Sequence, residues 1–334
     1  MDMEAKRARF EEAMQIVYGP YEADHHDPSW QPSSNPGAWA YRGRYLWTDA
    51  FGVVNFITLS REYDSKAYVY LNLAKRLAET VHSVLGRTRD GSARLPRATD
   101  AEPLNGGLRI GKMDEEGPDC DGQYHHYLTL WMFALNRLAQ ATEEPKWNVL
   151  AVQLAKAIHP HFMVNRHGRE SMVWKMSTAL SAPLMANKGH LDDVFGFVVY
   201  QLLQQTSIQF GYSAAADSLD ADIEQYGGIM DGAPKSLNGD PLDLGMGLWI
   251  AHFNREAGWA RELSAQGRDI AWDRFLPTST APVTAETRLH WPAFRECGAC
   301  LGIQCYCYST NNDDVALTEG VRGGAAGLGR QPKV

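Results

Sequence analysis

The sequence predicts an all-α protein, an α/α toroid of the six-hairpin barrel type in which inner helices are enclosed by outer ones. Amphipathic segments alternate along the chain with segments that are apolar on nearly all sides, as expected where one ring of helices surrounds another. The connections that lead from amphipathic to apolar segments are mostly long, and the return connections are short. All long loops must then emerge on one face, which carries the N-terminal ends of the inner helices.

The outer helices are expected in the amphipathic segments. The clearest spans 64–85, where Asp64 supplies a cap, apolar residues follow at helical spacing, and Gly86 ends the helix. Another spans 143–158, with Pro145 in its first turn. The same periodicity predicts further outer helices at 3–17, 213–226 and 258–275.

The inner helices are expected where the sequence is apolar all round, because such helices are buried on every side. These segments are 49–59, 122–138, 193–203, 243–253 and 292–306. Residues 163–176, in one of the long loops, predict a small β-hairpin that turns near His167 and Gly168. We expect a single barrel domain over 1–319, followed by a flexible Gly- and Arg-rich tail over 320–334.

The composition argues against nucleic acid and membrane as partners. The formal net charge is -8, with 40 acidic against 32 basic residues, whereas phosphate binding needs clustered Lys and Arg. No apolar run approaches the ~20 residues of a membrane span, and residues 1–12 lack the apolar core of a signal peptide. We therefore expect a cytoplasmic protein with a small-molecule substrate. The 10 Trp and 14 Tyr indicate either an aromatic-lined pocket or an aromatic-rich helical core.

Four of the five cysteines crowd between Cys297 and Cys307. Their spacing superficially resembles that of a zinc site. However, they lie on an apolar helix, on which Cys305 and Cys307 would point to different faces. We interpret them as small buried hydrophobic residues and expect no metal and no cofactor. The sequence also lacks a phosphate-binding loop, a dinucleotide fingerprint and a nucleophile elbow.

A carboxylate lies near the start of four inner helices: Asp49, Asp121, Asp193 and Asp243. Each could be only a helix cap, since Asp is a favoured N-cap residue. In a toroid, however, these N-termini converge on one cavity mouth, where repulsion and burial raise some carboxyl pKa values. That arrangement suits an acid/base pair for glycoside chemistry.

Three of these helix starts also share a short pattern, in which a glycine follows the acidic residue within the first turn. It occurs at 49–52, 193–196 and 243–245, and we interpret it as a weak internal repeat.

Histidines fall at three of the five inner-helix starts: His125 and His126, His190, and His290. Histidine serves as a general acid or base near neutral pH, although some of these residues could simply bond to loops. His125 and His126 are adjacent and point roughly 100° apart on a helix, so at most one faces the cavity. Nearby aromatic and polar residues complete a plausible sugar or polyol site: Trp47, Gln123, Tyr124, Trp174, Lys188 and Trp291.

The stretches LWTDAFG at 46–52, DCDGQYHHYLTLWMFALNRL at 119–138 and GHLDDVFGF at 189–197 resemble the six-hairpin glycosidase-like superfamily. That superfamily of α/α barrels includes the N-acylglucosamine 2-epimerase group. The resemblance spans about residues 1–310, although only five inner helices can be counted. It implies sugar chemistry through carboxylates or, in the epimerase branch, histidines, and in most branches without an obligatory metal. It also implies Asp49 and Asp121 as the acid/base pair, with His190 and His290 as the epimerase-like alternative.

The sequence thus predicts an enzyme acting by acid/base catalysis on a carbohydrate-like molecule, with glycoside hydrolysis as the first hypothesis. An isomerase, epimerase or cyclase in the same cavity is the second, and a non-catalytic ligand-binding barrel is the third. A zinc-dependent barrel enzyme is a fourth. The expected catalytic residues are Asp49, Asp121, His190 and Asp193. The expected substrate-binding residues are Trp47, Gln123, Tyr124, His125, His126, Trp174, Lys188, Asp243, His290 and Trp291.

Overall fold

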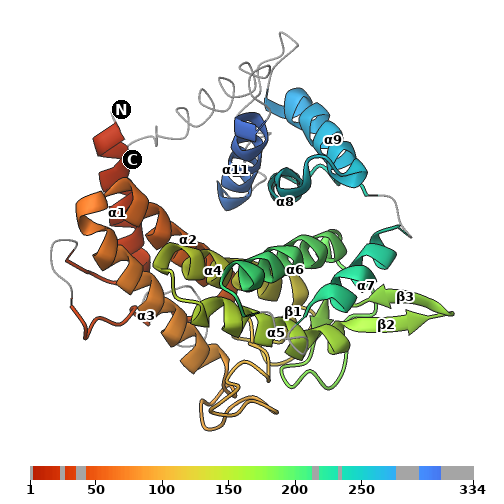
Figure 1. The fold of residues 1–334 in the computed structure, drawn as a ribbon, viewed down its shortest axis with the longest axis horizontal. Helices are drawn as coiled ribbons and strands as arrows, with labels where there is room; N and C mark the ends of the chain where they lie inside the picture. Colours follow the sequence, from red (N-terminus) through yellow and green to blue (C-terminus); the bar gives the residue numbers. More distant parts are fainter. Residues whose placement is uncertain are drawn as a thin grey trace. The chain divides into compact units, whose positions relative to one another are not determined.

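The computed structural model of the chain describes residues 3–22, 27–34, 43–212, 218–231, 235–275 and 293–309, and most of them are helical. The chain divides into two compact units, Met1–Ile229 and Met230–Val334 (Figure 1). The all-α fold class is therefore confirmed at this level. The predicted tail at 320–334 lies outside the described residues.

The helices of the first unit fall close to the predicted segments, except that the segment predicted at 213–226 corresponds to a helix over Asp220–Asp231. They are α1 (Met3–Tyr18), α2 (Leu46–Glu62), the short 3-10 helix η2 (Asp64–Lys66), α3 (Ala67–Leu85), α4 (His125–Thr142), α5 (Lys146–Phe162), α6 (Asp192–Gln209) and α7 (Asp220–Asp231), whose last residues pass into the second unit.

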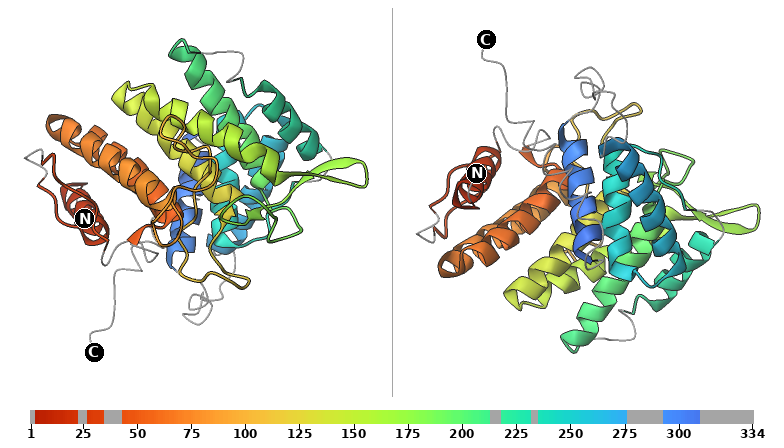
Figure 2. Two further views of the ribbon diagram at one scale, coloured as in Figure 1. Left: turned by 90° about the horizontal axis from the view of Figure 1, so that it is seen from below. Right: turned by 90° about the horizontal axis from the view of Figure 1, so that it is seen from above.

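Two layers of helices make up most of this unit. The apolar helices α2, α4 and α6 lie side by side with α4 in the middle, while α3 packs on α2, and α5 on α4 and α6 (Figures 1 and 2). Helix α3 buries one stripe, which includes Tyr70, Leu77 and Leu85, whereas α4 is buried over most of its surface. The predicted distinction between inner and outer helices thus corresponds to the two layers.

Short antiparallel strands join the loops that precede α4 and α6. Strand β1 (Gln123–Tyr124) pairs with β4 (Lys175–Met176), and β2 (Met163–Arg166) pairs with β3 (Arg169–Met172). The β2–β3 turn uses His167 and Gly168, both with positive φ, so the predicted hairpin is confirmed. The β1–β4 pair was not predicted.

The second unit contains α8 (Pro241–Ala251), η4 (His252–Asn254), α9 (Gly258–Phe275) and α11 (Ala293–Ser309). Helices α8 and α11 meet at glycines. A Cβ on Gly245 would lie 2.0 Å from the Gly298 oxygen, and one on Gly302 would lie 2.2 Å from the Gly245 oxygen. Side chains at these positions would force the two backbones apart.

The cysteines of α11 differ partly from the prediction. Cys300 and Cys307 pack against the core of the second unit, as expected of small hydrophobic residues. Cys297 is exposed, because it lies on the face of α11 away from that core. Within the described ranges, no group of three or more potential ligands could hold a metal ion. Among the same residues, no helix is long and apolar enough to cross a membrane.

Candidate functional site

The N-terminal turns of three helices meet in the first unit. Helix α2 contributes Trp47, α4 contributes His126, and α6 contributes Asp192. The His126 Nδ1 lies 3.3 Å from an Asp192 oxygen, and the ring centroids of Trp47 and His126 are 6.0 Å apart. The structure thus brings together the starts of the three inner-layer helices that the loop lengths predicted to share a face.

Asp192 holds both adjacent histidines. Its Oδ1 lies 3.1 Å from Nδ1 of His125 and 3.3 Å from Nδ1 of His126. The His125 side chain is fully buried, whereas that of His126 is 33% exposed. Of the two adjacent histidines, His126 is therefore the accessible one.

The buried side of this cluster is a chain of close polar contacts. The Tyr226 hydroxyl lies 2.6 Å from Nε2 of His125, and burial raises the pKa of that hydroxyl well above its ordinary value. The other ring nitrogen of His125 faces the Asp192 carboxylate. Burial would raise the pKa of Asp192, but the facing His126 and His125 outweigh it and hold that pKa below the usual range.

Two glycines make room for these contacts. An ideal Cβ on Gly189 would lie 1.5 Å from the Asp192 Oδ2, and one on Gly196 would lie 2.2 Å from Cζ of Tyr226. Any larger residue would push the carboxylate or the phenol out of place. Gly196 belongs to the predicted internal repeat. A glycine is needed at this position because the Tyr226 ring lies against it.

Aromatic rings surround the accessible histidine. The ring centroids of Tyr127, Trp174 and Tyr124 lie 5.0, 5.8 and 6.1 Å from that of His126. Tyr124 is buried, while Trp47, Tyr127 and Trp174 are partly exposed. We call His126 and these four rings the aromatic cluster. Its members come from α2, from the start of α4, and from the loop before α6.

A charged pair lies one residue further along α6. The Lys188 Nζ is 2.6 Å from the Asp193 Oδ2, and this lysine is 29% exposed although Asp193 is fully buried. Of the adjacent residues Asp192 and Asp193, the sequence predicted Asp193 as catalytic. In the structure it is Asp192 that contacts the histidines. Neighbouring helix positions point about 100° apart, so only one aspartate could face the histidines.

Asp121 differs from its predicted role. Helix α4 begins at His125, so Asp121 precedes the helix and cannot cap it. Its carboxylate is buried and accepts hydrogen bonds from Arg109, Arg89 and the backbone N–H of Gly111, with Arg109 fully buried as well. These contacts hold the loop of residues 86–122 in place.

Gln123 is also part of the scaffold. Its Nε2 donates to the carbonyls of Gly106 and Thr178 at 2.8 Å each, and its Oε1 accepts the Leu108 N–H at 3.0 Å. The side chain is completely buried. Its amide therefore joins two loops, and the predicted substrate contact does not fit its surroundings.

Asp49 forms a sealed ion pair. Its Oδ1 lies 3.3 Å from the Arg44 guanidinium, and Oδ2 accepts the Tyr45 N–H at 3.1 Å. Neither Asp49 nor Arg44 is exposed by more than 1%. Burial, opposed by Arg44, raises the pKa of Asp49 to about 7. The N-cap of α2 is Tyr45, so Asp49 is not a cap either.

The remaining predicted residues lie elsewhere. Asp243 belongs to the second unit, where it accepts the Asn238 N–H at 2.8 Å, and the N-cap of α8 is Asp240. His190 is exposed in the loop before α6. His290 and Trp291 lie outside the described residues.

Sequence reasoning missed Asp192, Tyr127 and Tyr226. The doublet of aspartates at 192 and 193 was visible, but nothing in the sequence showed which one faces the histidines. Tyr226 comes from α7, about 100 residues after His125, and no local pattern predicts such a contact.

No known protein-family model matches this chain, and no curated protein or solved structure matches it either. The contacts of the described residues therefore carry the functional inference.

Proposed function

We propose that this protein is an enzyme that moves a proton on a sugar or polyol-like small molecule, as an isomerase or epimerase, with His126 as the acid/base group. One observation carries the proposal. A partly exposed histidine is held by a buried carboxylate among aromatic rings.

The geometry of His126 suits proton transfer. Its Nδ1 faces Asp192, which leaves Nε2 as the ring nitrogen that can meet a substrate. A carboxylate behind one imidazole nitrogen selects the tautomer and orients the ring. Histidine changes protonation near neutral pH and is the most frequent general acid or base in enzymes. In this proposal Asp192 and Tyr226 are positioning residues, because they act through the histidines.

The surroundings of His126 favour a carbohydrate-like substrate. Flat aromatic faces such as those of Trp47 and Trp174 pack against the apolar C–H side of a sugar ring. The ammonium of Lys188, which is partly exposed beside Asp193, supplies a charged hydrogen-bond donor nearby. We further propose that the layer of α2, α4 and α6 is part of the inner ring of an α/α toroid.

The contacts favour isomerisation over glycoside hydrolysis. Hydrolysis by the usual mechanism needs two carboxyl groups that flank the substrate. The two expected ones, Asp49 and Asp121, are each buried against an arginine. The histidine supported by Asp192 is the better-placed group.

Solvent exchange tests the proposal. The protein would be incubated in D₂O with a panel of reducing sugars and N-acylated amino sugars, followed by NMR and mass spectrometry. We expect deuterium at one substrate carbon, lost in His126→Gln. The matched control is His190→Gln, which alters an exposed histidine of the adjoining loop and should retain exchange. Exchange that persists undiminished in His126→Gln would overturn the assignment.

A further inference from the structure

A pair of tyrosine hydroxyls joins the starts of α2 and α4 at the aromatic cluster. Tyr45 is the N-cap of α2, and Tyr127 lies in the first turn of α4. Their hydroxyl oxygens are within hydrogen-bond distance of each other, and their ring centroids are 5.5 Å apart. Both side chains are partly exposed, so solvent reaches the pair.

This pair has a hydroxyl proton to offer. A phenol hydroxyl donates one hydrogen bond and accepts up to two, and one of the two protons lies between the oxygens of Tyr45 and Tyr127. In the described part of the chain neither hydroxyl makes another hydrogen bond. Burial raises the pKa of Tyr127 above its ordinary value, which keeps this phenol protonated at neutral pH. The second proton of the pair is therefore available to a ligand oxygen.

The open nitrogen of His126 is directed toward the same side of α4. This helix lies between α2 and α6 (Figure 1), and the His126 Nδ1 faces Asp192 of α6 at 3.3 Å. The two nitrogens of an imidazole ring point in widely different directions, so Nε2 is turned away from α6 and toward α2. On that side the ring centroids of Tyr127 and Trp47 lie 5.0 and 6.0 Å from that of His126.

We propose that the pair of Tyr45 and Tyr127 donates a hydrogen bond to a carbonyl oxygen of the substrate, an open-chain aldose or ketose. This inference rests on the proposed function and narrows its substrate class, because a polyol without a carbonyl group is excluded. His126 takes the proton from the carbon beside the carbonyl. The C–H electron pair forms a C=C bond, and the C=O π pair moves to oxygen. Return of the proton to carbon reverses these shifts, so the step needs no co-reactant.

The hydroxyl pair would act on the charge that develops on this oxygen. Removing one preorganised donor to such an oxygen costs about 10²–10³ in kcat. We expect Tyr45→Phe or Tyr127→Phe, whichever removes the direct donor, to slow deuterium exchange at saturating substrate about 10²-fold with KM within a few-fold. The double variant should be no slower than the slower single variant, because the two hydroxyls act as a unit. Exchange that is undiminished in both single variants would overturn the inference.

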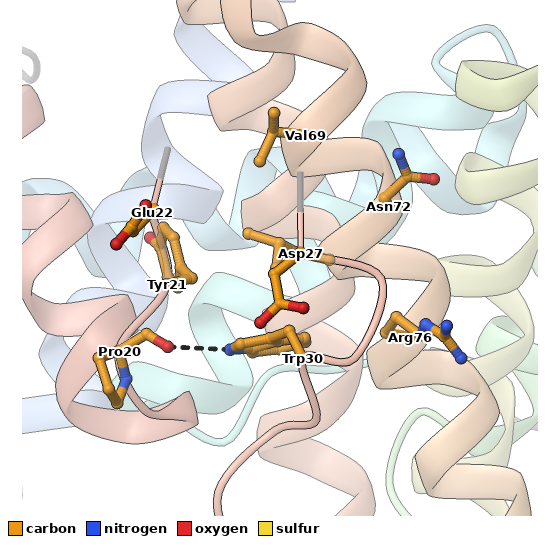
Figure 3. Close-up of a pocket in the computed structure, with 9 residues that line it drawn as sticks. Pro20, Tyr21, Glu22, Asp27, Trp30, Val69, Asn72 and Arg76 are labelled. Carbon is orange, nitrogen blue, oxygen red and sulfur yellow. Dashed lines mark hydrogen bonds between the residues drawn. The ribbon is translucent and has the colours of Figure 1, made fainter. Parts of the chain in front are cut away.

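The matched control is Tyr21→Phe. Tyr21 is also a tyrosine packed among aromatic rings, with Trp30 beside it next to α3 (Figure 3). The other rings near it, those of Phe56 and Tyr70, do not belong to the aromatic cluster either. This variant should retain the exchange rate of the wild type. A comparable loss in Tyr21→Phe would show that the effect is a general one of removing a packed phenol, and would overturn the inference.

Binding of a stable enolate mimic separates this inference from the proposed function. The probes are hydroxamates of the acids that correspond to the sugars of the panel, with the carbonyl-free alditols as comparison, measured by calorimetry on the full chain. We expect one hydroxamate to bind more tightly than its alditol and about tenfold more weakly in the slower single variant. Unchanged binding in both variants, or no binding, would overturn the inference even if the wild type exchanges deuterium. Weakened binding in a protein that exchanges no deuterium would support the oxygen site and refute only the proposed reaction.

Discussion

The N-terminal turns of α2 and α6, two helices of the first unit, share a local design. Residues 49–52 read Asp-Ala-Phe-Gly, and residues 193–196 read Asp-Val-Phe-Gly. In both, the aspartate pairs with a basic residue five positions earlier, Arg44 or Lys188. In both, the glycine leaves room for a tyrosine, since a Cβ on Gly52 would lie 2.0 Å from the Tyr18 hydroxyl and one on Gly196 would meet Tyr226.

These two helix starts differ in the residue before the aspartate and in their exposure. Position 48 is Thr and position 192 is Asp, and only the second offers a carboxylate to the histidines of α4. Arg44 is 1% exposed, whereas Lys188 is 29% exposed. The same motif therefore seals the start of α2 and leaves the start of α6 open. An aspartate recurs at these two helix starts, and the residue before it decides which of them contacts the histidines of α4.

The largest expected effect separates the two helix starts by activity. Asp192→Asn removes the carboxylate that orients His126 and should lower kcat/KM by about 10²-fold or more. Asp49→Asn, the matched change at the sealed start of α2, should leave kcat/KM within a few-fold. The two rates would be measured on the substrate found by solvent exchange. Equal losses in both variants would contradict the distinction between a sealed and an open helix start.

The second effect is on stability and depends on pH. The pKa of Asp49 is raised from 3.8 to about 7 in the folded protein. Between these two pH values the folded state therefore binds more protons than the unfolded state. The associated stability is present below pH about 4 and is lost as the pH rises to about 7. The Asp49→Asn variant cannot ionise at this position, so its stability does not fall over this pH range for this reason. Relative to the wild type, it should gain up to roughly 4 kcal/mol between pH 4 and 8, measured by urea unfolding. A constant difference across that range would refute the raised pKa.

Asp192 should behave in the opposite way. Its pKa is held below the ordinary value, so its contribution to stability is present above pH about 4 and declines as the pH falls below that. In Asp192→Asn, acid unfolding should begin with a smaller slope against pH than in the wild type, measured by circular dichroism at successive pH values.

A third effect comes from the glycines. Gly52→Ala and Gly196→Ala each insert a methyl group against a tyrosine, which should cost about 1–3 kcal/mol of unfolding free energy. Only Gly196→Ala displaces Tyr226, and with it His125 and Asp192, so only this variant should also lower kcat. A comparable loss of kcat in Gly52→Ala would mean that Tyr18 and the buried pair of Asp49 and Arg44 also take part in the reaction.

The smallest effect on stability is expected at the partly exposed basic residue, Lys188. Lys188→Gln should lower stability by no more than about 1 kcal/mol, because water can replace the ammonium. Arg44→Gln at the sealed start of α2 should cost more above pH 7, where Asp49 is ionised and would lose its paired charge. Thermal unfolding at pH 8 compares the two variants.

The sequence predicted elements whose signals are local. The stripe of α3 from Tyr70 to Leu85 and the hairpin turn at His167 depend on residues a few positions apart, and both were found. The convergence of the N-termini of α2, α4 and α6 followed from loop lengths. The sequence could not predict which polar side chains already have hydrogen-bond or ion-pair partners within the protein. Asp121 looked like a helix cap in the sequence, but Arg109 and Arg89 approach it from other parts of its loop.

The antiparallel pair β1–β4 has a mechanical consequence. Tyr124 pairs with Lys175, and the His125 N–H donates to the Trp174 carbonyl at 2.9 Å. The start of α4 and the loop bearing Trp174 are thereby tied together through their backbones, not only through ring contacts. The position of Trp174 relative to the histidines is therefore set by the backbone. Amide hydrogen exchange at His125 should accordingly be slow.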